Sequence, residues 1–192
     1  MSELYLGAIG GNRPTKGRAP ADNLLEALAE LRAHRVTPIR VSAIYRTPAF
    51  PPGSGPDFAN AAFVAQSGLT PHGVLSAFHA VEARFGRERM ERWGARTLDI
   101  DLIAAGSRIL PDAAGWRRWH DLAAEAQRVE SPDQLILPHP RMQDRAFVLV
   151  PLLDVAPDWR HPVLGRTIAE MCAEIPAADR DSVVKLADAP LL

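Results

Sequence analysis

Two aspartates two positions apart are the clearest chemical feature of this sequence. Asp99 and Asp101 alternate with leucine and isoleucine in the run from Leu98 to Ile103. Successive side chains of a strand point to opposite faces, so we expect both carboxylates on one face. Neighbouring carboxylates repel each other and are costly on a half-buried sheet unless a cation lies between them. Because Mg2+ prefers oxygen ligands and often keeps substrate phosphates in its remaining positions, the pair predicts a magnesium–nucleotide site.

A short arginine-rich loop directly precedes this strand. It contains Arg87, Arg89, Arg92 and Arg96, with Trp93 among them. Guanidinium groups stay charged at any working pH and bind phosphate oxygens through paired hydrogen bonds. Taken alone, the loop would be read as a solvated basic segment and the aspartates as the solvated face of an edge strand. Their adjacency favours a polyphosphate site, because phosphoryl transfer depends mostly on positioning and charge stabilisation.

Other familiar catalytic arrangements are absent from the sequence. The stretch from Gly10 to Gly17 lacks the second glycine that a P-loop places before its lysine, and no glycine-rich kinase loop with an H-R-D partner occurs. No G-x-S-x-G motif occurs, and Cys172, as the single cysteine, excludes an internal disulfide or a four-cysteine zinc site. His139 stands between two prolines, which restrict its backbone. Such a histidine suits a phosphate ligand, although a turn histidine without a function fits equally well.

Composition predicts one soluble domain with a large core. The chain has 192 residues, 47% of them hydrophobic, and a formal net charge of -1. One domain spanning residues 1–192 fits this length. The balanced charge gives no sign of a nucleic-acid or membrane partner, and no uncharged apolar run is long enough to cross a bilayer. The N-terminal segment lacks the pattern of a signal peptide, so we expect a cytoplasmic protein.

Hydrophobic periodicity and breaker residues predict the elements that position these side chains. Strands and helices interleave without regular βαβ spacing, which favours an α+β sandwich over a doubly wound parallel sheet. An insertion rich in tryptophan, arginine and alanine covers about 107–134, with a helix expected near 116–127. The expected strands are 4–10, 36–46, 58–66, 97–105 and 135–137, and the other expected helices are 22–33, 70–86, 144–153 and 166–174.

The helix expected between Thr70 and Gly86 is the best marked. Thr70 can cap its N-terminus, Pro71 suits the first helical position, and Gly86 can adopt the left-handed conformation after the last turn. Glu82 lies at the margin of an apolar stripe formed by Val74, Phe78, Val81 and Phe85. In the helix expected at 22–33, Asp22 is the expected N-cap.

Together these features resemble the 6-hydroxymethyl-7,8-dihydropterin pyrophosphokinase family. The resemblance runs from Tyr5 to about Met171, apart from the insertion. Its most specific part is RWGARTLDIDLI at 92–103, which is far more specific than two spaced aspartates. Supporting blocks in the same order are YRTPAF at 45–50, PDFANAA at 56–62, VEARFGRER at 81–89, LILPHPRMQDRAFVLVPL at 135–152 and APDW at 156–159.

The resemblance implies a fold and a reaction. The fold would be a ferredoxin-like α/β sandwich with a mainly antiparallel sheet. The enzyme would transfer pyrophosphate from ATP to 6-hydroxymethyl-7,8-dihydropterin in folate biosynthesis and release AMP. Asp99 and Asp101 would hold two Mg2+ ions on the triphosphate, while the pterin alcohol oxygen attacks the β-phosphorus.

The resemblance also implies which residues surround the two substrates. Arg87 and Arg92 would lie on a loop that closes over ATP, with Glu82 as a buried acid on the nucleotide side. Phe58 and Phe147 would sandwich the pterin ring, an arrangement that suits a flat polar heterocycle. The remaining nucleotide positions are Trp93, Arg96, His139 and Arg145, and the remaining pterin positions are Thr47, Pro48, Phe50 and Asn60.

Some features depart from the family pattern, and other functions remain open. Gly11 stands where the family usually has serine, and Phe58 where tyrosine is common. The insertion could cap the site, form a dimer contact or have no role. Alternative functions are a magnesium-dependent ATP transferase acting on a related heterocycle, a silenced paralogue, or a ferredoxin-like module that binds RNA. The last alternative predicts a basic sheet face with exposed aromatics, which Asp99 and Asp101 contradict.

Overall fold

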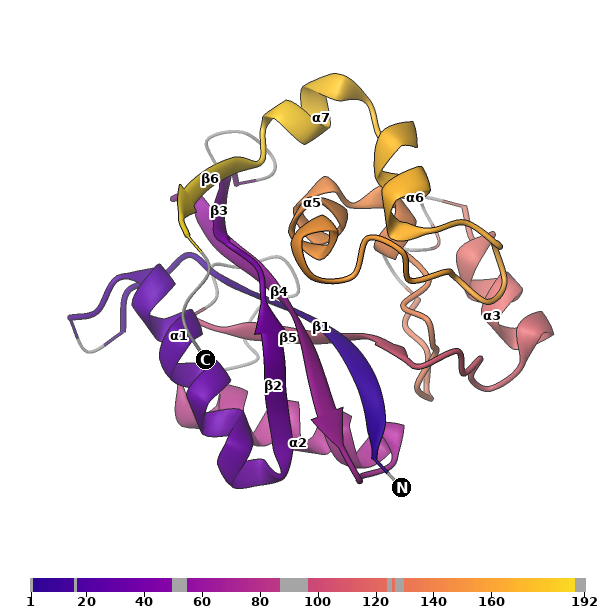
Figure 1. The fold of residues 1–192 in the computed structure, drawn as a ribbon, viewed down its shortest axis with the longest axis horizontal. Coiled ribbons are helices and arrows are strands. Elements are labelled where there is room, and N and C mark those ends of the chain that lie inside the picture. The colour runs from indigo at the N-terminus through magenta and orange to yellow at the C-terminus, as the bar shows by residue number, and fades with distance from the viewer. Residues whose placement is uncertain are drawn as a thin grey trace.

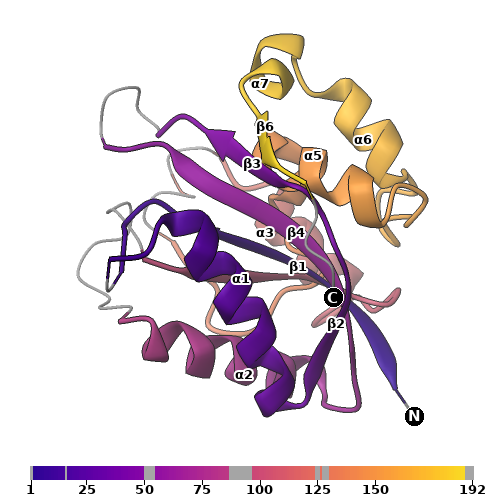
Figure 2. The same ribbon diagram turned by 60° about the vertical axis from the view of Figure 1, so that its left-hand side comes forward.

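The chain is built around one antiparallel sheet with helices on both faces (Figures 1 and 2). The computed structural model describes residues 2–15, 17–49, 55–86, 97–123, 126 and 130–188. Within them, one sheet has six strands. Five of them form the order β5-β1-β4-β3-β6, and the sixth, β2, pairs with β4. The strands are β1 (Glu3–Gly11), β2 (Val36–Val41), β3 (Ile44–Thr47), β4 (Phe58–Ser67), β5 (Asp99–Ala105) and β6 (Val184–Ala187). All described pairings are antiparallel, so the predicted α+β sandwich is confirmed.

Helices cover the two faces in separate groups. Helices α1 and α2 lie on one side of the sheet, and α5 and α6 lie on the other (Figures 1 and 2). The described helices are α1 (Pro20–Glu30), η1 (Leu31–His34), α2 (Pro71–Arg84), α3 (Ala113–His120), η2 (Met142–Asp144), α5 (Ala146–Val155), α6 (Ile168–Glu174) and α7 (Ala177–Asp181). No helix among the described residues is long and apolar enough to cross a membrane.

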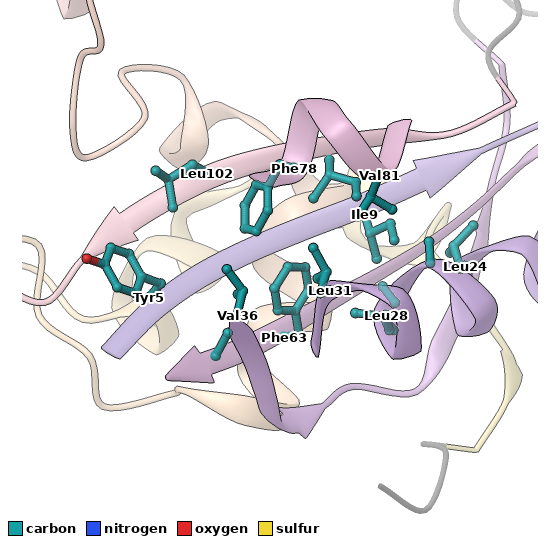
Figure 3. Packing of buried hydrophobic residues seen from close by; sticks show 14 of the residues in the cluster. Tyr5, Ile9, Leu24, Leu28, Leu31, Val36, Phe63, Phe78, Val81 and Leu102 are labelled. Carbon is teal, nitrogen blue, oxygen red and sulfur yellow. The ribbon is translucent and has the colours of Figure 1, made fainter. Parts of the chain in front are cut away.

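The face covered by α1 and α2 is a closed apolar core (Figure 3). Leu24 and Leu28 from α1 pack with Phe78 from α2 in one cluster. The ring of Phe78 meets Phe63 of β4 edge to face, with their centroids 5.8 Å apart. A Cβ on Gly7 of β1 would lie 2.2 Å from the Phe63 ring, so a side chain at this position would displace that ring. This face is thus closed by side chains from both helices and from strands β1 to β5.

Helix α2 forms as its residues predict. The Thr70 hydroxyl accepts a hydrogen bond from the amide of Gly73 at 3.2 Å, Pro71 opens the helix, and Gly86 has a φ of 76°. The apolar stripe of this helix is buried at Val74, Phe78 and Val81. Glu82, expected at the margin of the stripe, is itself only 1% exposed.

Three local predictions are wrong. Asp22 does not cap α1, because Pro20 starts the helix and Ala19 is the N-cap residue. The strand expected at 36–46 is two strands, because the hydroxyl of Ser42 replaces a backbone carbonyl as the acceptor for the amide of Ala62, at 2.9 Å. The segment 135–137 forms no strand, only an isolated bridge from Leu137 to Leu110.

The helix of the insertion also differs from its expected position. Helix α3 begins at Ala113 and ends at His120, whereas 116–127 was expected. The carboxylate of Asp112 accepts a hydrogen bond from the amide of Gly115 at 2.8 Å and caps the helix earlier than its apolar residues suggest.

Candidate active site

Strand β5 presents its two carboxylates to the face covered by α5. Ile100 and Leu102 lie in the core under α1 and α2, whereas Ile103 lies in the core on the α5 side. Asp101 pairs with Ala8 of β1, which belongs to the same α5-side core, and Asp99 pairs with Gly10. Directly paired residues of an antiparallel sheet share a face, so both aspartates lie on one face, as predicted, and this is the α5 side. Both are half-buried at the end of the sheet.

Three of the predicted pterin residues lie on the same face, on strands β3 and β4 beyond β1. Asn60 of β4 pairs with Gly10, which in turn pairs with Asp99. The Asn60 amide donates a hydrogen bond to the Thr47 hydroxyl at 2.7 Å, and both side chains are buried. Phe58 pairs with Thr47 and is partly buried. Thr47, Phe58 and Asn60 therefore form one group that faces the aspartates across β1.

Gly10 is a site residue that sequence reasoning missed. The expected strand ended at Gly10, but β1 continues through Gly11. A Cβ at Gly10 would lie 2.4 Å from Oδ1 of Asn60, so the missing side chain leaves room for the amide. A glycine inside a strand often marks such a close approach, which was the one available signal.

The turn that carries His139 is fastened to β5. The amide of His139 donates to the carbonyl of Ile103 at 2.8 Å, and Nδ1 of His139 accepts from the amide of Arg141 at 3.0 Å. Burial lowers the pKa of His139 to about 3, and the charges of Arg145 and Arg141 act in the same direction, while Asp99 opposes them. A neutral ring whose Nδ1 accepts a hydrogen bond carries its proton on Nε2. His139 can therefore donate from Nε2 to an anionic oxygen.

Arg145 links the acidic pair to an aromatic ring. Its guanidinium lies 3.8 Å from the carboxylate of Asp101 and 5.7 Å from the ring centroid of Phe147. Phe147, in the first turn of α5, is 40% exposed, although it is large and apolar. An exposed aromatic ring beside a cation can stack on a flat ligand.

Glu82 reaches β5 from α2. Its carboxylate accepts a hydrogen bond from the amide of Ile100 at 2.7 Å, between the two aspartates in sequence. The contact fastens the start of β5, which carries Asp99 and Asp101, to helix α2. A direct contact of Glu82 with a nucleotide stays a prediction.

The donor set of β5 fits magnesium. Among the described residues, no group of three or more histidine, cysteine, aspartate or glutamate side chains could hold a metal. Asp99 and Asp101 would supply two hard oxygen ligands and leave the other positions to water and phosphate, as Mg2+ sites commonly do. A structural zinc site would need four protein ligands.

Some predicted site residues lie outside the described part of the chain. These are Phe50, Arg87, Arg92, Trp93 and Arg96. Pro48, which follows Thr47 at the end of β3, is exposed. The structure thus brings together Thr47, Phe58, Asn60, Asp99, Asp101, His139, Arg145 and Phe147, and adds Gly10 to them.

Comparison with known proteins identifies the family. The model of the 7,8-dihydro-6-hydroxymethylpterin-pyrophosphokinase family matches residues 6–157. This chain belongs to that family. The resemblance inferred from the motifs is therefore confirmed. The matched part of the chain contains every site residue discussed above and ends before α6.

Curated relatives of the same family cover most of the chain. A protein of Synechocystis is 39% identical over 155 residues, which is 80% of this chain and 69% of the relative. One of Methylorubrum extorquens is 37% identical over 91% of this chain and 94% of its own length. One of Pseudomonas aeruginosa is 35% identical, over 92% and 93%. All three are named 2-amino-4-hydroxy-6-hydroxymethyldihydropteridine pyrophosphokinase.

Solved structures support the fold. An HPPK-DHPS protein of Plasmodium falciparum superposes with a TM-score of 0.64 at 14% identity. The match covers 91% of this chain but 44% of the Plasmodium chain, so this chain spans less than half of that protein. At this identity, the likeness is one of fold.

Proposed function

We propose that this chain transfers pyrophosphate from ATP to 6-hydroxymethyl-7,8-dihydropterin in folate biosynthesis, giving AMP and the pterin methyl diphosphate. The family and the names of the relatives support this reaction. The observation that carries the residue assignment is the row of Asp99, Gly10 and Asn60 across three strands. It puts a carboxylate suited to bind a metal and a hydrogen-bonding amide on one sheet face, as a reaction between a nucleotide and a heterocycle requires.

The acidic pair defines the nucleotide side of the proposed site. Two Mg2+ ions bound by Asp99 and Asp101 would neutralise charge on the triphosphate of ATP. His139 would donate from Nε2 to a phosphate oxygen, and its backbone hydrogen bond to Ile103 would help to hold the ring in place. Arg145 would stay between Asp101 and Phe147 and add a positive charge. Arg87, Arg92, Trp93 and Arg96 stay predicted nucleotide-binding residues.

The group of Thr47, Phe58 and Asn60 defines the pterin side. The Asn60 amide is held by Thr47 and would read the polar edge of the pterin, while Phe58 and Phe147 would stack on its faces. In the reaction, the hydroxymethyl oxygen forms a bond to the β-phosphorus and loses its proton. The bond between the β-phosphorus and the oxygen that bridges to the α-phosphorus breaks, and AMP leaves.

We also propose that residues 1–192 act as one catalytic domain. Strand β6, which lies beyond the family match, pairs with β3 and so extends the sheet that carries Thr47. The cytoplasmic location expected from the sequence stays a prediction.

AMP formation tests the proposed function. The purified protein is incubated with Mg-ATP alone, with 6-hydroxymethyl-7,8-dihydropterin, and with 6-methyl-7,8-dihydropterin, which lacks the attacking hydroxyl. We expect AMP in equal amount to pterin diphosphate with the first pterin only, and loss of turnover when Mg2+ is chelated. Absence of AMP from a folded protein that binds ATP would contradict the proposal and favour another heterocycle as acceptor or a silenced paralogue.

A further inference from the structure

The insertion packs against the turn that carries His139. Its helix α3 contains Trp116, which is 1% exposed and is among the largest fully buried side chains. In Figure 1, α3 lies on the α6 side of the molecule, next to the chain that leads into α5. The buried Trp116 side chain therefore anchors α3 on the rest of the fold, although most neighbouring residues of the helix are exposed.

Three contacts join the insertion to residues on both sides of His139. The indole Nε1 of Trp116 donates to the carbonyl of Pro138 at 2.7 Å. Leu110 and Leu137 exchange two backbone hydrogen bonds of 2.8 and 3.1 Å. The carbonyl of Trp119 accepts from the guanidinium of Arg141 at 3.2 Å. The positions bound are therefore 137, 138 and 141.

The hydrogen bond from Trp116 satisfies the buried carbonyl of Pro138. Proline has no N–H, so the carbonyl is the only backbone polar group of the buried Pro138. Without the indole, a buried acceptor next to His139 would lose its donor, which favours a rearranged turn. His139 is then held from one side by Ile103 of β5 and from the other by Trp116 of α3.

Aromatic contacts fix the orientation of the indole. The ring of Trp116 stacks on His120 at 4.7 Å with an interplanar angle of 26° and meets His161 edge to face at 4.9 Å. His161 is fully buried, and its Nδ1 accepts from the amides of Val163 and Leu164. Because the indole is packed on two rings, its N–H has one available direction, toward Pro138.

We propose that Trp116 is a positioning residue for the nucleotide side of the site: it holds the Pro138 carbonyl and thereby the His139 turn in the geometry that binds ATP. The inference rests on the proposed function, because it assigns His139 to the nucleotide. It gives the insertion a role beyond the three that the sequence left open.

The test compares two tryptophans of the same aromatic cluster. Trp159 also meets His161, at 5.7 Å, and also donates its indole N–H to a carbonyl, that of Gly106 at 2.9 Å. Trp116→Phe and Trp159→Phe each remove one indole hydrogen bond and keep an aromatic ring. Only the first removes a contact to the His139 turn, so Trp159→Phe is the matched control.

Three measurements separate positioning from general stability. For Trp116→Phe, we expect a KM for ATP raised about five- to tenfold, an unchanged KM for the pterin, and faster exchange of the amides of His139, Arg141 and Met142. Trp159→Phe should lower the melting temperature to a similar degree and leave all three values unchanged. An unchanged KM for ATP in Trp116→Phe, or an equal change in both variants, would overturn the proposal.

A binding measurement keeps this test independent of turnover. The dissociation constant of α,β-methylene-ATP with Mg2+ is measured by calorimetry for the wild type and both variants. If the wild type binds this analogue but forms no AMP with the pterin, the proposed function fails on its own. A weaker affinity in Trp116→Phe alone would then still support positioning of a nucleotide site, and equal affinities would reject it.

Discussion

The two faces of the sheet use the same strands for different purposes. On the face under α1 and α2, the described side chains of β5 are apolar and fully buried, as Ile100 and Leu102 show. On the α5 face of the same strand, Asp99 and Asp101 are half-buried, and the apolar core begins at Ile103. Alternation along one strand thus joins the hydrophobic core to the site. Neighbouring residues of β5 should therefore separate stability from activity.

The two faces also differ in the exposure of their polar and aromatic side chains. On the α1/α2 side, buried polar groups have partners within the fold: Glu82 accepts from the amide of Ile100, and the Tyr5 hydroxyl donates to the carbonyl of Leu69 at 2.6 Å. On the α5 side, the buried Asn60 and Thr47 are also paired, but Phe147 is exposed and Asp99 and Asp101 are half-buried. Those features stabilise a folded chain little by themselves and become useful when a cation and a flat ligand bind.

The largest expected effect is the loss of activity in Asp101→Asn. The amide is nearly isosteric but lacks the charge that we propose holds Mg2+, so pyrophosphate transfer should fall by at least about a hundredfold. The free energy of unfolding should change by less than about 1 kcal/mol, because the ion pair with Arg145 is partly exposed and 3.8 Å long. Turnover and urea unfolding measure the two quantities. Full activity would remove Asp101 from the metal site.

The adjacent residue should show the opposite behaviour. Leu102→Ala opens a cavity in the closed core under α1 and α2 and should lower the free energy of unfolding by about 3 kcal/mol. At a temperature where the variant is still folded, its kcat and KM values should stay within about twofold of the wild type. If Leu102→Ala lowers kcat as strongly as Asp101→Asn, the two faces of β5 are not independent.

A pH dependence of stability should arise on the α5 side. Burial lowers the pKa of His161 to about 4, and His120 and Arg166 act in the same direction. The unfolded chain then binds a proton more readily than the folded one, so this contribution to stability is complete above about pH 6.5 and is lost as the pH falls toward 4. The loss should reach about 3 kcal/mol.

Urea unfolding from pH 4 to 8 measures this dependence. The difference between the wild type and His161→Gln isolates His161, since His139 contributes equally to both proteins. The exposed His72 provides the control variant His72→Gln, which should keep the pH dependence of the wild type. Identical curves for all three proteins would contradict the burial argument.

The smallest expected effects come from substitutions of two glycines of β1, which lie on opposite faces of the sheet. Gly10→Ala places a Cβ against Oδ1 of Asn60 on the α5 face and should raise the KM for the pterin about tenfold, with an unchanged KM for ATP. Gly7→Ala places a Cβ against the Phe63 ring on the other face and should cost about 1–3 kcal/mol of stability without a change in either KM. A pterin KM raised equally by both would mean that the amide of Asn60 is not the affected group.

The sequence by itself determined the features that depend on neighbouring residues. Side-chain alternation predicted the shared face of Asp99 and Asp101, and caps predicted the bounds of α2. The specific block at 92–103 predicted the family. Each of these signals lies within a few positions of the chain, where backbone geometry relates spacing directly to direction.

Only the tertiary structure decided the contacts between distant segments. The hydroxyl of Ser42 splits a strand because Ala62 lies opposite it, and Gly10 matters because Asn60 reaches over it. Trp116 of the insertion binds Pro138, and no local pattern marks that pairing. The physical reason is that a hydrogen bond or a close approach between strands depends on which residue the fold places opposite, and this partner is set by the packing of the whole sheet.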